Sequence, residues 1–84
     1  MTRKTSICLL KPIGKVVEQR RKDLTLSLDE LAHRTSLKRA YLSDVEAGKG
    51  NLSFRTLCKI AEALELTASQ LLVLAEAMVD STMG

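Results

Sequence analysis

The sequence contains very few aromatic side chains. Among its 84 residues, only Tyr41 and Phe54 are aromatic, so a hydrophobic core has to be built mainly from Leu, Ile, Val and Ala. A pocket walled by large rings, of the kind that holds a flat cofactor, is not expected. We therefore expect no cofactor and no small-molecule ligand.

Residues that carry catalytic or metal chemistry are also scarce. His33 is the only histidine, and Cys8 and Cys58 are far apart, outside any CxxC or Cys/His spacing. Reduced thiols are therefore favoured over a disulfide, and no metal site is expected. Because no paired carboxylates or glycine-rich phosphate loop accompany a nucleophile, we predict no catalytic residue and no enzyme.

Long apolar runs are missing as well. The longest, LLVLA at residues 71–75, is far shorter than the roughly 20 residues of a membrane helix, and the N-terminus lacks the apolar segment of a signal peptide. The length fits one small domain. We expect a soluble, cytoplasmic single domain over residues 1–84, with a core of about 12–78 and an N-terminal arm of 1–11.

Positive charge is absent from the last part of the chain. All 13 Lys and Arg residues lie before residue 60, although the net charge of the whole chain is only +3. A basic first part joined to an apolar, mildly acidic end suggests two surfaces with different partners, one of them a polyanion. A solvated basic face without a partner is the alternative.

The apolar pattern predicts an all-α chain without strands. A first helix is expected from Pro12, because proline is tolerated at the first position of a helix. This helix places Ile13, Val17 and Arg21 on one line at i, i+4 spacing. The line is apolar except for Arg21.

Capping residues predict where the next two helices begin. Ser27 and Glu30 have the spacing of a capping box, which predicts a second helix over residues 28–35. Ser36 is a plausible cap for a third helix that opens at residue 37 or 38. That helix is expected to stop at Gly48, since glycine suits the left-handed conformation beyond a helix end.

Two further helices complete the expected five. Ser53 is predicted to begin the fourth, in which the residues at helical spacing are Phe54, Leu57, Ala61 and Leu64. Thr67 and Gln70 form a second capping box and begin the fifth. Residues 1–10 and about 80–84 are expected to be frayed.

Two charges occupy apolar faces. Arg21 lies on the apolar line of the first helix, and Glu46 lies beside Leu42 and Val45 on that of the third. Because an unpaired charge in a core costs several kcal/mol, the two are expected to meet as a largely buried ion pair. This pair would turn the start of the third helix outward. The alternative is that both side chains reach solvent separately.

The segment LSLDELAHRTSLKRAYLSDVEAGKGNLSFRTLCKIAEALEL resembles the helix-turn-helix of the lambda-repressor and Cro family. The resemblance covers residues 12–75 and implies a five-helix DNA-binding fold. Within that family, RAYLSDVEAGKGNLS at residues 39–53 is most similar to the controller proteins of restriction-modification systems. The resemblance also matches Arg21 and Glu46 to the family's internal salt bridge.

The resemblance implies which residues touch DNA. Positions that read bases in family members correspond here to Arg39, Ala40, Asp44 and Lys38. The matching positions beside them on the DNA backbone are Tyr41 and Ser43.

Each of these roles has a plainer alternative. Arg39 can bind guanine O6 and N7 with its planar fork, or only a phosphate. Asp44 can accept from a cytosine amino group, or can simply exclude other sequences. Ala40 can pack on a thymine methyl group or merely permit close approach, and the Tyr41 hydroxyl can reach a phosphate while its ring covers the core edge.

The start of the fourth helix is a candidate phosphate site. Lys49, Arg55 and the backbone amides near Ser53 gather there, where the helix dipole favours an anion. Two departures from the family pattern lie elsewhere. Leu28 replaces a glutamine that holds a phosphate in many members, and Thr25 replaces the glycine usual after the first helix.

A homodimer is expected from the apolar end of the chain. One short recognition helix reads only a few base pairs, so specificity normally requires two of them about one DNA turn apart. The residues expected at the dimer interface are Leu66, Leu71, Leu74 and Met78.

The sequence as a whole predicts a transcriptional regulator that binds a pseudo-palindromic operator in double-stranded DNA. A restriction-modification controller protein is the first interpretation, and RNA polymerase is a further candidate partner. The alternatives are a phage-type repressor, an antitoxin of the same fold, and a helical module that binds an acidic protein instead of DNA.

Overall fold

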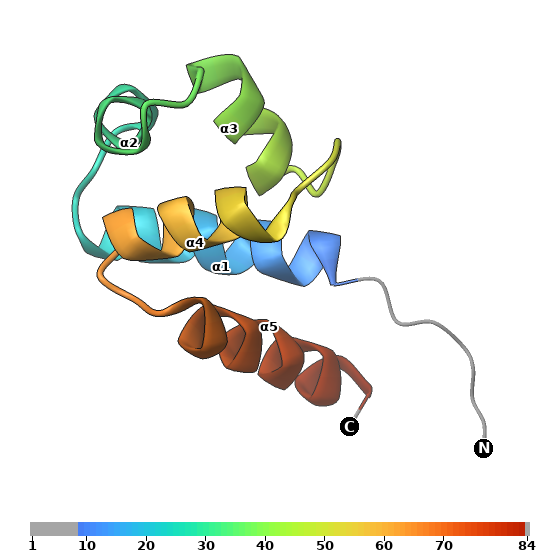
Figure 1. The fold of residues 1–84 in the computed structure, drawn as a ribbon. Helices are drawn as coiled ribbons and strands as arrows, with labels where there is room; N and C mark the ends of the chain where they lie inside the picture. Colours follow the sequence, from blue (N-terminus) through green and yellow to red (C-terminus); the bar gives the residue numbers. More distant parts are fainter. Residues whose placement is uncertain (1–8, 84) are drawn as a thin grey trace.

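The computed structural model describes residues 9–83, which form five helices and, over that range, no strand. They are α1 (Leu10–Asp23), α2 (Leu28–Thr35), α3 (Arg39–Glu46), α4 (Phe54–Ala63) and α5 (Ala68–Met83). The α2–α3 pair lies on one side of α1 and α4, and α5 lies on the other side (Figure 1). The predicted all-α, five-helix class is therefore confirmed, whereas Cys8 and the arm up to residue 8 lie outside the described residues.

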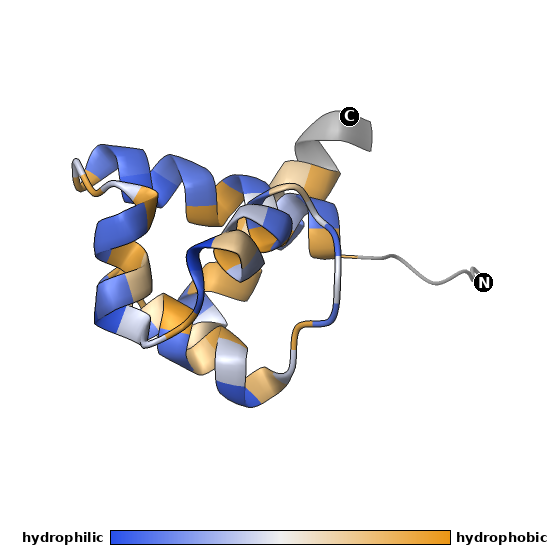
Figure 2. Cartoon of the chain, turned by 90° about the horizontal axis from the view of Figure 1, so that it is seen from above, coloured by the Kyte–Doolittle hydropathy of each residue, from blue (hydrophilic) through white to orange (hydrophobic). Residues whose placement is uncertain are grey.

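Each helix or its end contributes an aliphatic side chain to one shared core. The largest fully buried side chains are those of Val17, Leu31, Leu42, Ile60, Leu64 and Leu71. The helices carry hydrophilic and hydrophobic residues on different sides (Figure 2). None of the described helices is long and apolar enough to cross a membrane.

Neither aromatic residue belongs to this core. Tyr41 is half-buried, and Phe54 is 69% exposed. Phe54 has the expected helical spacing from Leu57 and Ala61, but unlike those two residues it is not buried. Because Phe54 is the first residue of α4, its ring lies beyond the part of the helix that packs on the core.

Two helix starts are capped as the sequence predicts. The Ser27 hydroxyl accepts from the Glu30 amide at 3.0 Å, and the Glu30 carboxylate accepts from the Ser27 amide at 2.8 Å. The hydrogen bond from the Ser27 amide to the carboxylate is the main cause that lowers the pKa of Glu30. Thr67 and Gln70 make the same reciprocal pair, with distances of 3.0 and 2.9 Å. Both capping boxes are confirmed.

Several predicted boundaries are wrong. The first helix begins at Leu10 rather than Pro12, which is tolerated inside the first turn because the amides there have no intrahelical acceptor. Ser36 does not cap α3: with φ of 60° it is the left-handed C-cap of α2, and Lys38 is the N-cap of α3. The helix α5 continues to Met83 instead of fraying near residue 80.

A buried glycine brings α1 and α3 into close approach. A Cβ atom added at Gly14 would lie 2.4 Å from the carbonyl oxygen of Val45 and 2.7 Å from that of Glu46. Only a residue without a side chain fits between the two backbones. The C-terminal end of α3 is thus pressed directly onto α1, next to the predicted ion pair.

Candidate nucleic-acid interface

The turn between α2 and α3 is held by one buried hydroxyl. The Thr35 hydroxyl donates to the carbonyl of Leu31 at 2.8 Å and accepts from the amide of Leu37 at 3.3 Å. Thr35 is 5% exposed. Ser36 then reverses the chain through its left-handed conformation. Two short helices are thereby joined by a tight, internally bonded turn.

The expected ion pair between α1 and α3 is present. Arg21 Nε lies 2.7 Å from Glu46 Oε2, and Nη2 lies 3.1 Å from Oε1, so the contact is bidentate. Arg21 Nη1 also donates to the carbonyl of Leu26 at 2.9 Å. The side chains of Arg21 and Glu46 are only 12% and 9% exposed. Hydrogen bonding to Glu46 raises the pKa of Arg21, which stays protonated.

This pair sets which face of α3 meets solvent. Leu42 and Val45 are buried on the same side as Glu46. The opposite side is therefore turned outward, and its exposed residues are Lys38, Arg39, Ala40, Ser43 and Asp44. The structure thus gathers the four expected base-reading residues and Ser43 on one accessible surface, which we call the α3 face.

Tyr41 has a structural contact that the sequence did not reveal. Its hydroxyl donates to the carbonyl of Asn51 at 2.5 Å. The half-buried ring and this hydrogen bond attach the loop after α3 to the helix itself. The hydroxyl oxygen keeps its capacity to accept a hydrogen bond.

The start of α4 has the features expected of a phosphate site. Lys49 and Arg55 are exposed on either side of the N-cap, Ser53. The Ser53 hydroxyl is already used, since it accepts from the Thr56 amide at 3.1 Å and donates to Thr56 Oγ1 at 2.9 Å. An anion there would consequently meet backbone amides and the two cations rather than the Ser53 side chain.

One contact on the α3 face was missed by sequence reasoning. Arg39 Nε lies 3.1 Å from Asp29 Oδ1, across the turn between α3 and α2. Both side chains are well exposed, at 65% and 80%. The helical spacing within either helix gives no sign of this pair, because it depends on the angle of the turn. Within residues 9–83, no cluster of His, Cys, Asp and Glu could hold a metal ion.

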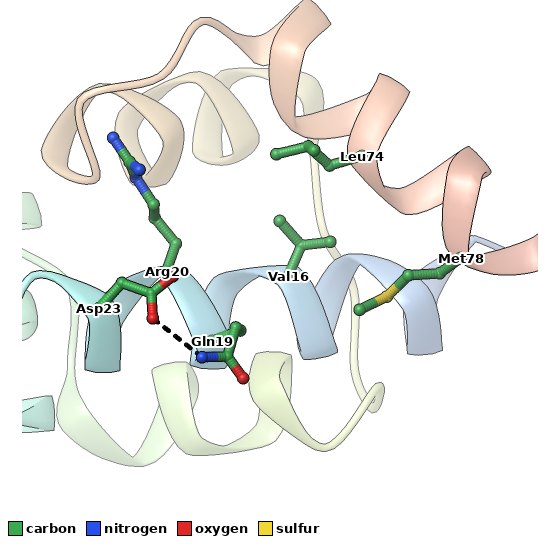
Figure 3. A pocket seen from close by; sticks show the side chains of 6 residues that line it. All are labelled: Val16, Gln19, Arg20, Asp23, Leu74 and Met78. Carbon is green, nitrogen blue, oxygen red and sulfur yellow. Dashed lines mark hydrogen bonds between the residues drawn. The ribbon is translucent and has the colours of Figure 1, made fainter. Parts of the chain in front are cut away.

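The expected dimer residues have different environments. Leu71 is fully buried, so it belongs to the core of the single chain and is not available to a second copy. Leu66 is half-buried at the turn before α5. Leu74 is 45% exposed, and with Met78 it faces α1 across a groove of about 360 Å³ (Figure 3). The other lining residues are Val16, Gln19, Arg20 and Asp23.

Comparison with known proteins agrees with this geometry. A family model described as helix-turn-helix matches residues 17–71. The chain belongs to the helix-turn-helix family. This is the lambda-repressor and Cro type of helix-turn-helix, a family of regulatory DNA-binding proteins rather than enzymes.

Individual helix-turn-helix relatives cover much of the chain. It is 36% identical over 56 residues to the ImmF control region 10 kDa protein of Bacillus phage phi105, a match that spans 67% of this chain and 62% of the phage protein. The restriction-modification controller protein C.AhdI of Aeromonas hydrophila is 32% identical, with a TM-score of 0.71 over 74% of this chain and 94% of its own.

A third relative was solved in complex with DNA. SinR, the master regulator for biofilm formation, is 34% identical, with a TM-score of 0.66. The match covers 71% of this chain and 97% of the SinR chain. The chain therefore spans less than two thirds of the phage relative's length but nearly all of these two solved domains.

Proposed function

We propose that this DNA-binding transcriptional regulator reads a pseudo-palindromic operator as a homodimer, with one α3 in the major groove of each half-site. The observation that carries the proposal is the rotation of α3. Because the Arg21–Glu46 pair turns one side of the helix inward, the α3 face is fully accessible to a duplex. A helix presented at the surface after a tight turn fits the major groove.

The α3 face supplies the groups that read base edges. Arg39 can donate two hydrogen bonds to guanine O6 and N7, and Asp44 can accept from a cytosine amino group. Ala40 is small enough to approach a thymine methyl group, and Lys38 adds a flexible donor at the helix start. Around them, the proposed contacts to the DNA backbone are the side chains of Tyr41, Ser43, Lys49 and Arg55 and the main-chain amides near Ser53.

The dimer would form through the outer side of α5 and the groove against α1. Leu74 and Met78 lie on α5 and Val16 lies opposite on α1, which gives an apolar lining (Figure 3). No Lys or Arg follows residue 59, so no positive charge on α5 opposes a second copy. Leu66 lies in the turn just before α5. These features support self-association, which doubles the number of bases read.

The similarity to C.AhdI supports a role as a restriction-modification controller. Such a regulator would act in the cytoplasm, with RNA polymerase as a further partner. The similarity to a phage control-region protein favours a second candidate, a phage-type repressor. A neighbouring gene for an endonuclease and methyltransferase would support the first, and one for phage proteins the second.

Selection of bound duplexes from a random pool tests the DNA proposal. The expected result is an enriched sequence with two-fold symmetry and half-sites about one helical turn apart. For a dimer that neutralises about 6 to 10 phosphates, affinity should fall by roughly 10³ to 10⁵ between 50 and 200 mM salt. Binding that depends little on salt, or no enrichment, would favour an acidic protein partner instead.

A further inference from the structure

Asp29 is the one acidic side chain that the described structure pairs with a proposed base-reading residue. It is the second residue of α2, and Arg39 is the first of α3, so the pair bridges the two helices of the motif. The contact is made by Arg39 Nε to Asp29 Oδ1 at 3.1 Å. Its position beside the α3 face connects it to recognition rather than to the core.

The chemistry of the contact leaves the reading edge of Arg39 available. A guanidinium group has five N–H donors, one on Nε and two on each terminal nitrogen. Asp29 lies at ion-pair distance from Nε. The ion pair is measured at Nε, so the terminal nitrogens, whose fork matches guanine O6 and N7, remain available to a base. A carboxylate beside Nε also restricts the directions in which the fork can point, because it attracts the guanidinium group.

An acid at this place would otherwise weaken DNA binding. Asp29 lies within ion-pair distance of Arg39, so DNA bound to the α3 face would bring phosphates near it. A carboxylate near phosphates repels them unless a cation neutralises it. Asp29 also lies in the first turn of α2, where it interacts favourably with the helix dipole, but that effect does not involve Arg39.

The pair matters most once water is excluded. At exposures of 65% and 80%, the two side chains interact weakly in the free protein because solvent screens them. In a closed protein–DNA interface the effective dielectric constant is lower, and the same contact becomes stronger. The ion pair therefore strengthens binding only in the complex with DNA, and only where a guanine accepts hydrogen bonds from the terminal nitrogens of Arg39.

We propose that Asp29 is a positioning residue that aims Arg39 at one guanine and so determines specificity rather than total affinity. This inference rests on the proposed function, and it assigns Asp29 no direct contact with DNA. It requires that the two residues act as a unit. Removing Asp29 should relax the base preference set by Arg39 and leave the other positions of the operator unchanged.

The test begins from the operator selected out of a random pool. Comparing pools selected by wild type and Arg39→Ala identifies the base pair that Arg39 reads. The dissociation constants of wild type, Asp29→Asn, Asp29→Ala, Arg39→Ala and the Asp29→Ala/Arg39→Ala double variant are then measured on that operator and on a duplex carrying one G-to-A change there. Glu62→Gln, an exposed acid on α4, controls for the loss of one negative charge.

The expected result is a loss of discrimination at one position. Arg39 should favour guanine by roughly 5- to 150-fold in wild type, the range of a bidentate contact. Asp29→Ala should lose most of that factor, and Asp29→Asn part of it, with equal or tighter binding to random duplex. In the Arg39→Ala background, Asp29→Ala should change nothing at this base pair. Glu62→Gln should affect both duplexes alike.

Two results would overturn the inference. One is full guanine preference in Asp29→Ala, and the other is an equal effect of Asp29→Ala with and without Arg39, which would indicate a role in the helix alone. A failure of the proposed function looks different, because then no duplex is enriched even by the wild-type protein. Circular dichroism of each variant checks that the helical content is unchanged.

Discussion

The outward surfaces of α3 and α5 differ in how each helix is oriented. Both helices bury apolar side chains, but α3 also has the directional Arg21–Glu46 ion pair and the close contact at Gly14. The helix α5 begins at a capping box and packs on the core through the buried side chains of Leu71 and Ala75. The polar face that has to meet bases in one orientation is thus set by a bidentate ion pair, whereas the buried side chains of α5 named here are apolar.

Breaking the ion pair should have the largest effect. Glu46→Ala leaves the Arg21 guanidinium, which is only 12% exposed, without its carboxylate. We expect a loss of about 3 kcal/mol in the free energy of unfolding, the lower end for a buried pair because some exposure remains. Urea unfolding followed by circular dichroism measures this. Glu18→Ala, which removes an exposed pair with Lys22, should cost less than about 0.5 kcal/mol.

Glu46→Ala should also affect DNA binding through α3 without affecting dimerisation through α5. At temperatures where Glu46→Ala is folded, operator affinity should fall further than the folded fraction predicts, because α3 can rotate. Sedimentation equilibrium should show the same dimerisation constant as wild type. If operator affinity follows the folded fraction alone, then the pair stabilises the fold without orienting α3.

The proposed dimer surface on α5 is tested by introducing a charged side chain at Leu74. Leu74→Glu places a carboxylate in the groove opposite Val16, where burial against a second copy would leave it unpaired. A cost of several kcal/mol should weaken dimerisation by roughly 100-fold or more. Stability of the single chain should change little, since Leu74 is 45% exposed. Sedimentation equilibrium at micromolar concentration makes the measurement.

A neighbouring residue provides the matched control. Val73 is 61% exposed and does not line the groove, so Val73→Glu should leave dimerisation near the wild-type value. Should the wild-type chain itself remain a monomer at high micromolar concentration, the dimer proposal is wrong and the two faces do not cooperate.

Two cations of the proposed DNA interface, Arg39 on the α3 face and Lys49 before α4, should have different effects. Arg39→Ala should cost about 1 to 3 kcal/mol on the operator and relax the preference at one base step. Lys49→Ala should weaken binding to all sequences alike and lower the salt slope by about 1. Fluorescence anisotropy on operator and random duplexes at several salt concentrations distinguishes them. If Arg39→Ala lowers the affinity for both duplexes equally, then Arg39 contacts only a phosphate.

The features that the sequence predicted correctly depend on spacing within one helix. The capping boxes at Ser27 and Thr67 are i, i+3 pairs, and the inward positions of Arg21 and Glu46 follow from helical periodicity. The contact between Arg39 and Asp29 could not be found in this way, because its distance is set by the turn between two helices.

Other errors have equally local causes. Ser36 suits both an N-cap and a left-handed position, and only the hydrogen bonds of Thr35 decide between them. Leucine and valine side chains follow one another at residues 71–74, so the pattern does not show that Leu71 faces the core rather than a second copy. The fold class and most helix starts were thus predictable, but the inner and outer sides of α5 were not.

The connections that follow α1 and α4 have similar sequences, which differ only in the middle residue. Leu24–Leu26 and Leu64–Leu66 each enclose a residue with positive φ, Thr25 at 56° and Glu65 at 64°. Thr25, where the resemblance implies a glycine, thus adopts the left-handed conformation that glycine would adopt without strain. A left-handed backbone costs a residue with a side chain roughly 1 to 2 kcal/mol, and β-branching makes the conformation still less favourable.

Thr25→Gly should therefore stabilise the fold slightly. Relief of strain is partly offset by the larger entropy of glycine in the unfolded chain, which leaves a gain of about 0.5 to 1 kcal/mol. Glu65→Gly should gain less, since Glu is not β-branched, and neither change should alter base preference or dimerisation. Urea unfolding of both variants tests this. A loss of stability in Thr25→Gly would instead show that the hydrogen bond from the Thr25 hydroxyl to the Leu24 carbonyl, 2.6 Å long, outweighs the strain.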